Sequence, residues 1–293
     1  MVQVKALACE LPREQGLPFS RLSHRDIARE AVEQGIVASI SGTTVWRWLS
    51  EDAIRPWTHR SWIWPRDPEF EAKAARVLDL YEGKWDGKPL GPEDYVISAD
   101  EKTSIQARRR KHTAKPPASG HLRRYEAEYQ RQGALAYLAA WDVGRAKVFG
   151  LCRQKTGIDS FHALVDLVMQ QEPYRSANRV FWITDNGSSH RGERSVRRLA
   201  KWYPQAIQVH TPVHASWLNQ IEIYFSIVQR KVLTPNEFLA LAELENTLMQ
   251  FQSHYQRIAE PFEWKFTTED LNRLLVQIPE ASDKAAGQNR VAA

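Results

Sequence analysis

The chain has 293 residues, of which 43% are hydrophobic, so it can bury a sizeable core and is not expected to be disordered. Its formal net charge of +5 weakly favours a polyanionic partner. Cys9 and Cys152 are its only cysteines, which excludes a disulfide framework and a cysteine-based zinc site. No apolar run approaches the ~20 residues that span a bilayer, and the N-terminus lacks a signal-peptide pattern. We therefore expect a cytoplasmic protein with no membrane partner.

The first helices in chain order form a candidate DNA-binding domain. A helix is predicted from Ser23, its N-cap, to Gly35, and a second begins at Ser41 or Thr43. This pair is typical of a helix-turn-helix, although a plain helical hairpin fits equally well. Together with the tryptophans between positions 46 and 64, it predicts a small all-α, partial helix-turn-helix domain over 1–66. Arg47, on the second helix, is then a candidate DNA contact.

An amphipathic helix over 69–83 follows, and with the polar loop after it we interpret 67–94 as a linker. The rest of the chain alternates between strands and helices. This order predicts an α/β fold with a mixed sheet flanked by helices, compatible with an RNase H-like domain. The predicted strands are 95–105, two within 133–152 around a turn at 142–144, one ending at Asp185, and 206–213. The predicted helices are 158–170, 193–202, 216–232 and 237–258. Residues 276–293 are expected to form a flexible tail.

A basic stretch interrupts this alternation between positions 108 and 124. It contains Arg108, Arg109, Arg110 and Lys111 together with two prolines and a glycine, so a loop is predicted. The loop either holds DNA phosphates, the interpretation that we favour, or is simply a solvated charged segment.

Three acidic residues occupy unusual positions. Asp100 lies in an apolar strand, Asp185 ends another, and Glu222 flanks the apolar stripe of a helix. Carboxylates that converge repel one another unless a cation neutralises them, and hard oxygen ligands favour Mg²⁺ or Mn²⁺. The three acids therefore predict a site for two metal ions that catalyses phosphoryl transfer. The alternative is that each acid is a helix cap or a surface charge.

The segments SADEKT, TDNGSSHRG and TPVHASWLNQIEIYFSIVQRKVL closely resemble bacterial insertion-sequence transposases of the mariner-related branch of the DDE superfamily. The resemblance implies an RNase H-like catalytic domain, here at 95–275, with Asp100, Asp185 and Glu222 as its metal-binding acids. It also implies cleavage and strand transfer at terminal inverted repeats, insertion at TA, a homodimer on paired double-stranded DNA ends, and a nucleoid-associated location. Family members usually carry two helix-turn-helix units, whereas only the second is recognisable here, so we expect a truncated copy.

Other residues of these motifs are candidates for supporting roles. Asn186, His190, His214 and Asn219 either contact the scissile phosphate and orient the carboxylates, or make local hydrogen bonds only. Glu101 is expected on the opposite sheet face from Asp100 and not to be a ligand. Trp217 is expected in the core. Two other functions stay open, namely an inactive DNA-binding remnant and a stand-alone RNase H-like nuclease.

Overall fold

The computed structural model describes residues 1–58 and 67–277, and its contacts divide the chain into two compact units, Met1–Ile63 and Trp64–Ala293. The predicted tail at 276–293 lies outside the described residues from position 278 onward. So does part of the tryptophan-rich segment, at 59–66. Within the described residues, no helix is both long and apolar enough to cross a membrane.

The first unit is a cluster of three short helices, α1 (Val2–Cys9), α2 (His24–Glu33) and α3 (Gly42–Glu51). Ser23 caps α2 in a capping box with Asp26, and Ser41 caps α3. Their apolar faces meet in one small core around Leu7, Ile27 and Leu49. The sequence predicts Ser23 correctly and gives Ser41 as one of two candidate caps for α3, but it does not predict α1.

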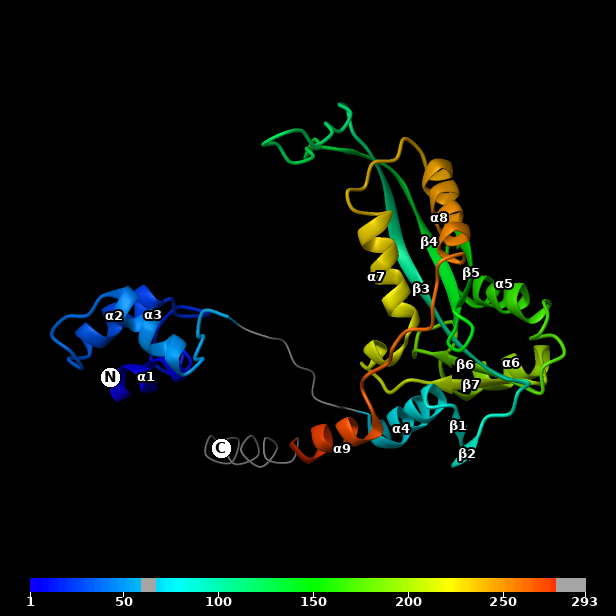
Figure 1. The fold of residues 1–293 in the computed structure, drawn as a ribbon, viewed down its shortest axis with the longest axis horizontal. Helices are drawn as coiled ribbons and strands as arrows, with labels where there is room; N and C mark the ends of the chain where they lie inside the picture. Colours follow the sequence, from blue (N-terminus) through cyan, green and yellow to red (C-terminus); the bar gives the residue numbers. More distant parts are fainter. Residues whose placement is uncertain (59–66, 278–293) are drawn as a thin grey trace. The chain divides into compact units, whose positions relative to one another are not determined.

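The second unit is built on a five-stranded mixed sheet with the order β5-β4-β3-β6-β7 (Figure 1). β3, β4 and β5 are successive antiparallel neighbours, while β6 and β7 run parallel to β3. The apolar run of β6 is buried, as expected for a central parallel strand. The strands are β3 (Asp94–Arg109), β4 (Gln130–Asp142), β5 (Lys147–Arg153), β6 (Arg179–Thr184) and β7 (Ala206–His210).

Helices cover both faces of this sheet, because side chains alternate along each strand. On β4, Leu138 and Ala140 face α5 (Ile158–Met169) and α6 (Gly192–Trp202). Tyr137 and Trp141 face α7 (Ile221–Lys231) and α8 (Leu241–Tyr255) on the other side (Figure 1). The sheet is therefore the middle layer of three.

Residues 67–94, which the sequence predicts as a linker, belong to the second unit. α4 (Phe70–Tyr81) packs against Phe181 and Val209 of the sheet and against α9 (Thr268–Gln277), which the sequence does not predict. The short hairpin β1 (Lys84–Trp85) and β2 (Lys88–Pro89) follows α4. The apolar stripe of α4 covers the sheet because α7 and α8 cover only part of that face.

Three predicted elements differ in the structure. Arg108 and Arg109 are not in a loop but end β3, where they pair with Arg131 and Gln130 of β4. The helix predicted over 216–232 is divided into η1 (Ser216–Leu218) and α7, because the Asn219 side chain bonds to β3 instead of continuing a helical turn. The helix predicted over 237–258 is the shorter α8.

Candidate metal centre

Asp100 and Asp185 lie on neighbouring parallel strands at the edge where β6 ends. β3 pairs with β6 from Asp94 opposite Arg179 to Ser98 opposite Ile183. The same register places Asp100 opposite Asp185, the first residue after β6. β3 continues past this edge because its other side is paired with β4. The two carboxylates therefore meet beside the carboxyl end of β6, where ligands of open α/β sheets usually bind.

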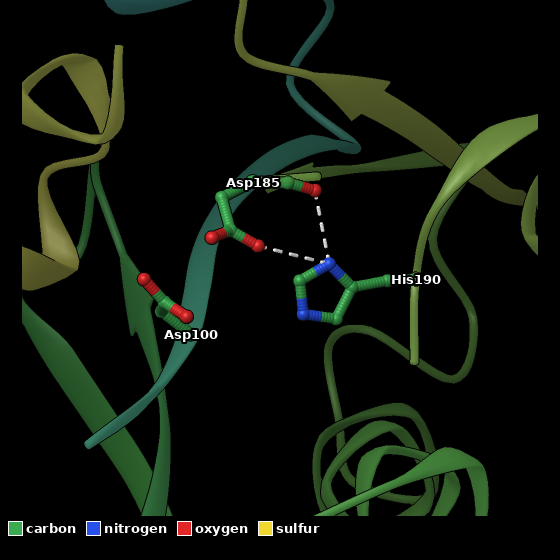
Figure 2. Close-up of side chains that lie close together, drawn as sticks. All are labelled: Asp100, Asp185 and His190. Atoms are coloured by element: carbon green, nitrogen blue, oxygen red, sulfur yellow. Dashed lines mark hydrogen bonds and ion pairs between the residues drawn. The ribbon is translucent and has the colours of Figure 1, made fainter. Parts of the chain in front are cut away.

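His190 completes a cluster with these two acids, shown in Figure 2. A carboxylate oxygen of Asp100, one of Asp185 and a ring nitrogen of His190 all lie within 4.8 Å of one another. Asp185 Oδ1 accepts a hydrogen bond of 2.7 Å from the Gly187 amide and lies 3.2 Å from His190 Nδ1. The same His190 nitrogen is 2.9 Å from the Asp185 carbonyl oxygen. The turn after β6 thus holds the Asp185 side chain in place.

Glu101 reaches this cluster from the next position along β3. Glu101 Oε2 lies 3.2 Å from His190 Nε2, and Glu101 Oε1 accepts a hydrogen bond of 2.9 Å from Ser189 Oγ. The sequence predicts Glu101 on the opposite sheet face from Asp100 and not as a metal ligand. The cluster of possible metal-binding atoms does not include Glu101, but its side chain contacts Ser189 and His190 in the turn that follows β6.

The charges of the cluster perturb one another. Burial, followed by the nearby charge of Asp185, raises the pKa of Asp100 to about 7. Burial disfavours the charged form of His190, but the hydrogen bond and negative charge of Glu101, supported by Asp185, outweigh it and raise the pKa of His190. The nearby negative charges therefore contribute to both shifts, since they favour the neutral form of Asp100 and the charged form of His190.

Glu222 lies in the first turn of α7 and is not part of the cluster within 4.8 Å. It is still close enough to interact electrostatically. Burial raises the pKa of Glu222, the charge of Lys102 opposes this rise, and Asp185 adds to it. The geometry thus brings two of the three predicted acids together with His190, and places the third nearby.

The break between η1 and α7, at 219–221 and called the hinge below, is hydrogen-bonded to β3, the strand that carries Asp100. Asn219 is fully buried; its Oδ1 accepts from Ser98 Oγ, and its Nδ2 donates to the Ala99 carbonyl oxygen at 3.0 Å. Ser98 Oγ also accepts from the Ile221 amide at 2.8 Å, and Tyr81 Oη accepts from the Gln220 amide at 3.1 Å. These bonds determine where Glu222 stands relative to Asp100.

The donor set suits a hard divalent cation. Carboxylate oxygens are the ligands that Mg²⁺ and Mn²⁺ prefer. Burial and, after it, the charge of Asp185 raise the pKa of Asp100, and a bound cation would oppose both effects by favouring the ionised carboxylate. Asp100 and Asp185 therefore fit a metal site, with His190 and Glu222 beside them.

A family model described as DDE superfamily endonuclease matches residues 95–245, more than half of the chain. The chain belongs to the DDE superfamily of endonucleases. The matched segment begins with β3 and ends within α8, so it contains both strands of the acid pair as well as Glu222. No curated protein matched the sequence.

Among solved structures, the endonuclease is similar to the Mos1 mariner transposase. It matches the Mos1 strand transfer complex with 14% identity and a TM-score of 0.51, over 98% of this chain and 77% of that one. The mariner Mos1 paired end complex with Mg matches with 12% identity, a TM-score of 0.51 and the same coverage. The Mos1 mariner paired end complex with Mn matches with 14% identity and a TM-score of 0.50, over 98% of this chain and 78% of that one. At this identity the likeness shows the fold, and it confirms the predicted RNase H-like mixed sheet flanked by helices.

The other predicted supporting residues lie at differing distances from the acids. Asn186 Nδ2 donates to the Thr211 carbonyl oxygen at 2.7 Å and so joins the ends of β6 and β7. His214 is exposed, with a positive φ of 64°. The sequence predicts Trp217 in the core; this is wrong, because the side chain is 44% exposed and touches Phe266 edge-on.

The predicted DNA-contacting residues also differ in exposure. Arg47 is exposed on α3 of the first unit, and Arg109 and Lys111 are exposed in the second. Arg110 is buried and Arg108 is partly buried; both stack on tyrosine rings. The basic segment is therefore not a uniformly solvated charged loop.

Sequence reasoning misses Ser98, Tyr81 and Ser189, and it gives Glu101 no role. Ser98 carries one usable signal, since it stands two residues before Asp100 on the same face of the strand. Tyr81 gives no signal, because it is one more aromatic residue in the apolar stripe of a helix. Its contact with Gln220 joins positions far apart in the chain.

Proposed function

We propose that this DDE endonuclease is a transposase that cleaves and transfers DNA strands at terminal inverted repeats, with two Mg²⁺ or Mn²⁺ ions held by Asp100, Asp185 and Glu222. One observation supports it most strongly: two carboxylates of a DDE superfamily domain face each other where β6 ends. The similarity to Mos1 complexes adds a transposase precedent for the fold. When bound, the metal ions would supply activation of the attacking oxygen and stabilisation of the leaving oxygen.

Some residues of the site would bind the metal ions, and others would orient the metal-binding side chains. Asp100 and Asp185 supply metal-binding oxygens, and Glu222 approaches from α7. Glu101 and His190 position Asp185 through the hydrogen bonds described above, and Asn219 positions α7 against β3. Asn186 keeps the turn after Asp185 in place through Thr211. His214, exposed on the loop before α7, is free to contact the DNA phosphate.

The DNA would be held outside this centre. We assign sequence recognition to the first unit, as a helix-turn-helix with Arg47 on α3, because its two capped helices leave that side chain exposed. Arg109 and Lys111 would hold phosphates nonspecifically. The partner is double-stranded DNA with terminal repeats and a TA target, bound by a homodimer on paired ends.

The experiment is cleavage of a supercoiled plasmid that carries the coding sequence with its flanking inverted repeats. Wild-type protein should cut at the repeat ends with Mg²⁺ or Mn²⁺ and not with EDTA. Asp185→Asn should lower the rate at least about a hundredfold, because the metal contribution is several kcal/mol. Asp159→Asn, the same change at an exposed acid of α5, should cut like the wild type. Equal activity of both variants would refute the site.

A further inference from the structure

The outer end of β3, beyond the acid pair, lines a pocket of about 510 Å³. Its other walls come from the segment around Tyr125 and Tyr129 and from the loop that follows α7. Three charged side chains line it, Lys102, Arg108 and Arg110, and all are basic. No carboxylate of the described chain lines this pocket, so it is a concentrated positive site.

The two arginines of the pocket lack the partners that buried arginines normally have. Arg110 is only 9% exposed, yet its Nε and Nη1 are buried without a hydrogen-bond partner in residues 1–58 and 67–277. Arg108 Nε is also buried without a hydrogen-bond partner in this part of the chain. Neither arginine forms an ion pair with any carboxylate that the structure describes. Buried donors without acceptors are unfavourable, so the pocket is complete only when an acceptor enters it.

Aromatic stacking holds the guanidinium groups in position. The Arg110 guanidinium carbon lies 4.7 Å from the ring centre of Tyr125, and that of Arg108 lies 4.5 Å from Tyr129. A guanidinium stacked on a ring keeps its in-plane N–H groups free for a planar, two-point contact. The acceptor that suits this arrangement is a phosphate or carboxylate.

The backbone around Arg108 is also fixed. Asn236 Oδ1 accepts from the Arg108 amide at 3.0 Å, and Asn236 Nδ2 donates to the Gln106 carbonyl oxygen at 2.7 Å. The Phe238 amide donates to the Arg108 carbonyl oxygen at 3.1 Å. The pocket is therefore held on both sides and does not depend on freely moving surface side chains.

The place of the pocket along β3 points to a nucleic-acid strand as the ligand. Lys102 stands two residues after Asp100 at the near end, and Arg108 is roughly 20 Å farther along the same strand at about 3.3 Å per residue. A DNA strand that starts at the acid pair and follows β3 would therefore pass Lys102 and reach Arg108 several nucleotides farther on. The volume suits one nucleotide and not a duplex.

We infer that this pocket binds a phosphodiester group of a DNA strand that continues from the metal centre, with Arg108 and Arg110 as its anion-binding residues. The inference rests on the proposed function for the identity of the strand. It goes beyond a general basic surface, because it separates Arg108 and Arg110 from their exposed neighbour Arg109.

The test is binding of a short fluorescein-labelled single-stranded DNA to the full chain, measured by anisotropy in EDTA so that the metal centre does not contribute. Arg110→Met and Arg109→Met each remove one positive charge, so general attraction falls equally in both. Arg110→Met should weaken binding about tenfold, the effect of losing a charge-assisted contact, and Arg109→Met about twofold. Inorganic phosphate should compete with the DNA in the wild type and lose this effect in Arg110→Met.

The controls keep the inference separate from folding and from catalysis. Arg110→Lys keeps the positive charge but cannot form the two-point guanidinium contact. Its affinity for the DNA should lie between the affinities of the wild type and Arg110→Met, even if thermal melting shows that Arg110→Met is destabilised. Equal losses in Arg109→Met and Arg110→Met would overturn the pocket. Tighter binding of RNA than of DNA of the same sequence would overturn the assignment to DNA. Because no metal is present, these results are independent of whether Asp185→Asn abolishes cleavage.

Discussion

The two ends of β3 carry side chains of opposite charge in different environments. At the inner end, Asp94, Asp100 and Glu101 each have partners, and the strand is paired on both sides up to Ser98. At the outer end, β4 is the strand paired with β3, and Arg108 and Arg110 have buried donors with no acceptor among residues 1–58 and 67–277. One strand can therefore carry both an acidic site and an anion pocket, because its pairing changes along its length.

The largest effect should follow a change in the inner, doubly paired part. Ile97 is fully buried, and Ile97→Ala should lower the free energy of unfolding by about 2–5 kcal/mol through the lost apolar contacts and the cavity. The matched change Ile158→Ala, at a residue that is 45% exposed, should cost about 1 kcal/mol or less. Arg109→Ala at the outer end should stay within about 0.5 kcal/mol. Urea unfolding measures all three, and similar losses would contradict the contrast between the ends.

A smaller loss of stability is expected at the hinge, whose hydrogen bonds hold the start of α7 against β3. Asn219→Ala removes the acceptor of the buried Ser98 hydroxyl proton and the side-chain donor to the Ala99 carbonyl oxygen, which should cost about 1–3 kcal/mol. Because the hinge positions Glu222, the cleavage rate should fall more than DNA binding does. Asn246→Ala, at an exposed position of α8, is the control and should leave both stability and rate unchanged. A stable Asn219→Ala variant with full activity would show that the hinge bonds do not position Glu222.

The smallest effect concerns acid stability at the start of β3. Arg179 Nε and Nη2 donate to Asp94 at 3.0 and 2.5 Å, and this contact lowers the pKa of Asp94 although burial opposes it. A carboxyl group whose pKa is lower in the folded state stabilises the fold above its unfolded pKa of about 3.9, and this contribution is lost as pH falls through the folded pKa. Asp94→Asn should therefore lower the free energy of unfolding by about 1 kcal/mol at neutral pH. As pH falls, the free energy of unfolding of this variant should decrease less steeply than that of the wild type. Parallel pH curves for wild type and variant would contradict this assignment.

Much of the fold follows from local patterns. The buried run before Asp185, the turn between β4 and β5, and the capped helices of the first unit each carry their own signal, and each is in the structure as predicted. The parallel pairing of β3 with β6 then brings Asp100 and Asp185 together. The sequence suggests this meeting because both acids lie in or after apolar strands.

The rest depends on contacts between distant positions. The Glu101–His190 contact arises only because β6 stops at Thr184 and leaves the edge of β3 open, a fact about strand lengths that no local pattern contains. The sequence predicts Arg108 and Arg109 in a loop because prolines and a glycine follow them, but pairing with β4 extends the strand through Arg109. Arg110 lies just beyond the strand as predicted, and its contact with Tyr125 accompanies its burial.

The central claim is that Asp100 and Asp185 together hold a divalent metal ion, and the most direct test is calorimetric titration of the full chain with Mn²⁺. Wild type and Asp159→Asn should bind Mn²⁺ alike. Asp185→Asn should weaken binding at least about tenfold, since it removes a ligand oxygen and leaves the fold intact. Unchanged Mn²⁺ affinity in a folded Asp185→Asn variant would contradict the account.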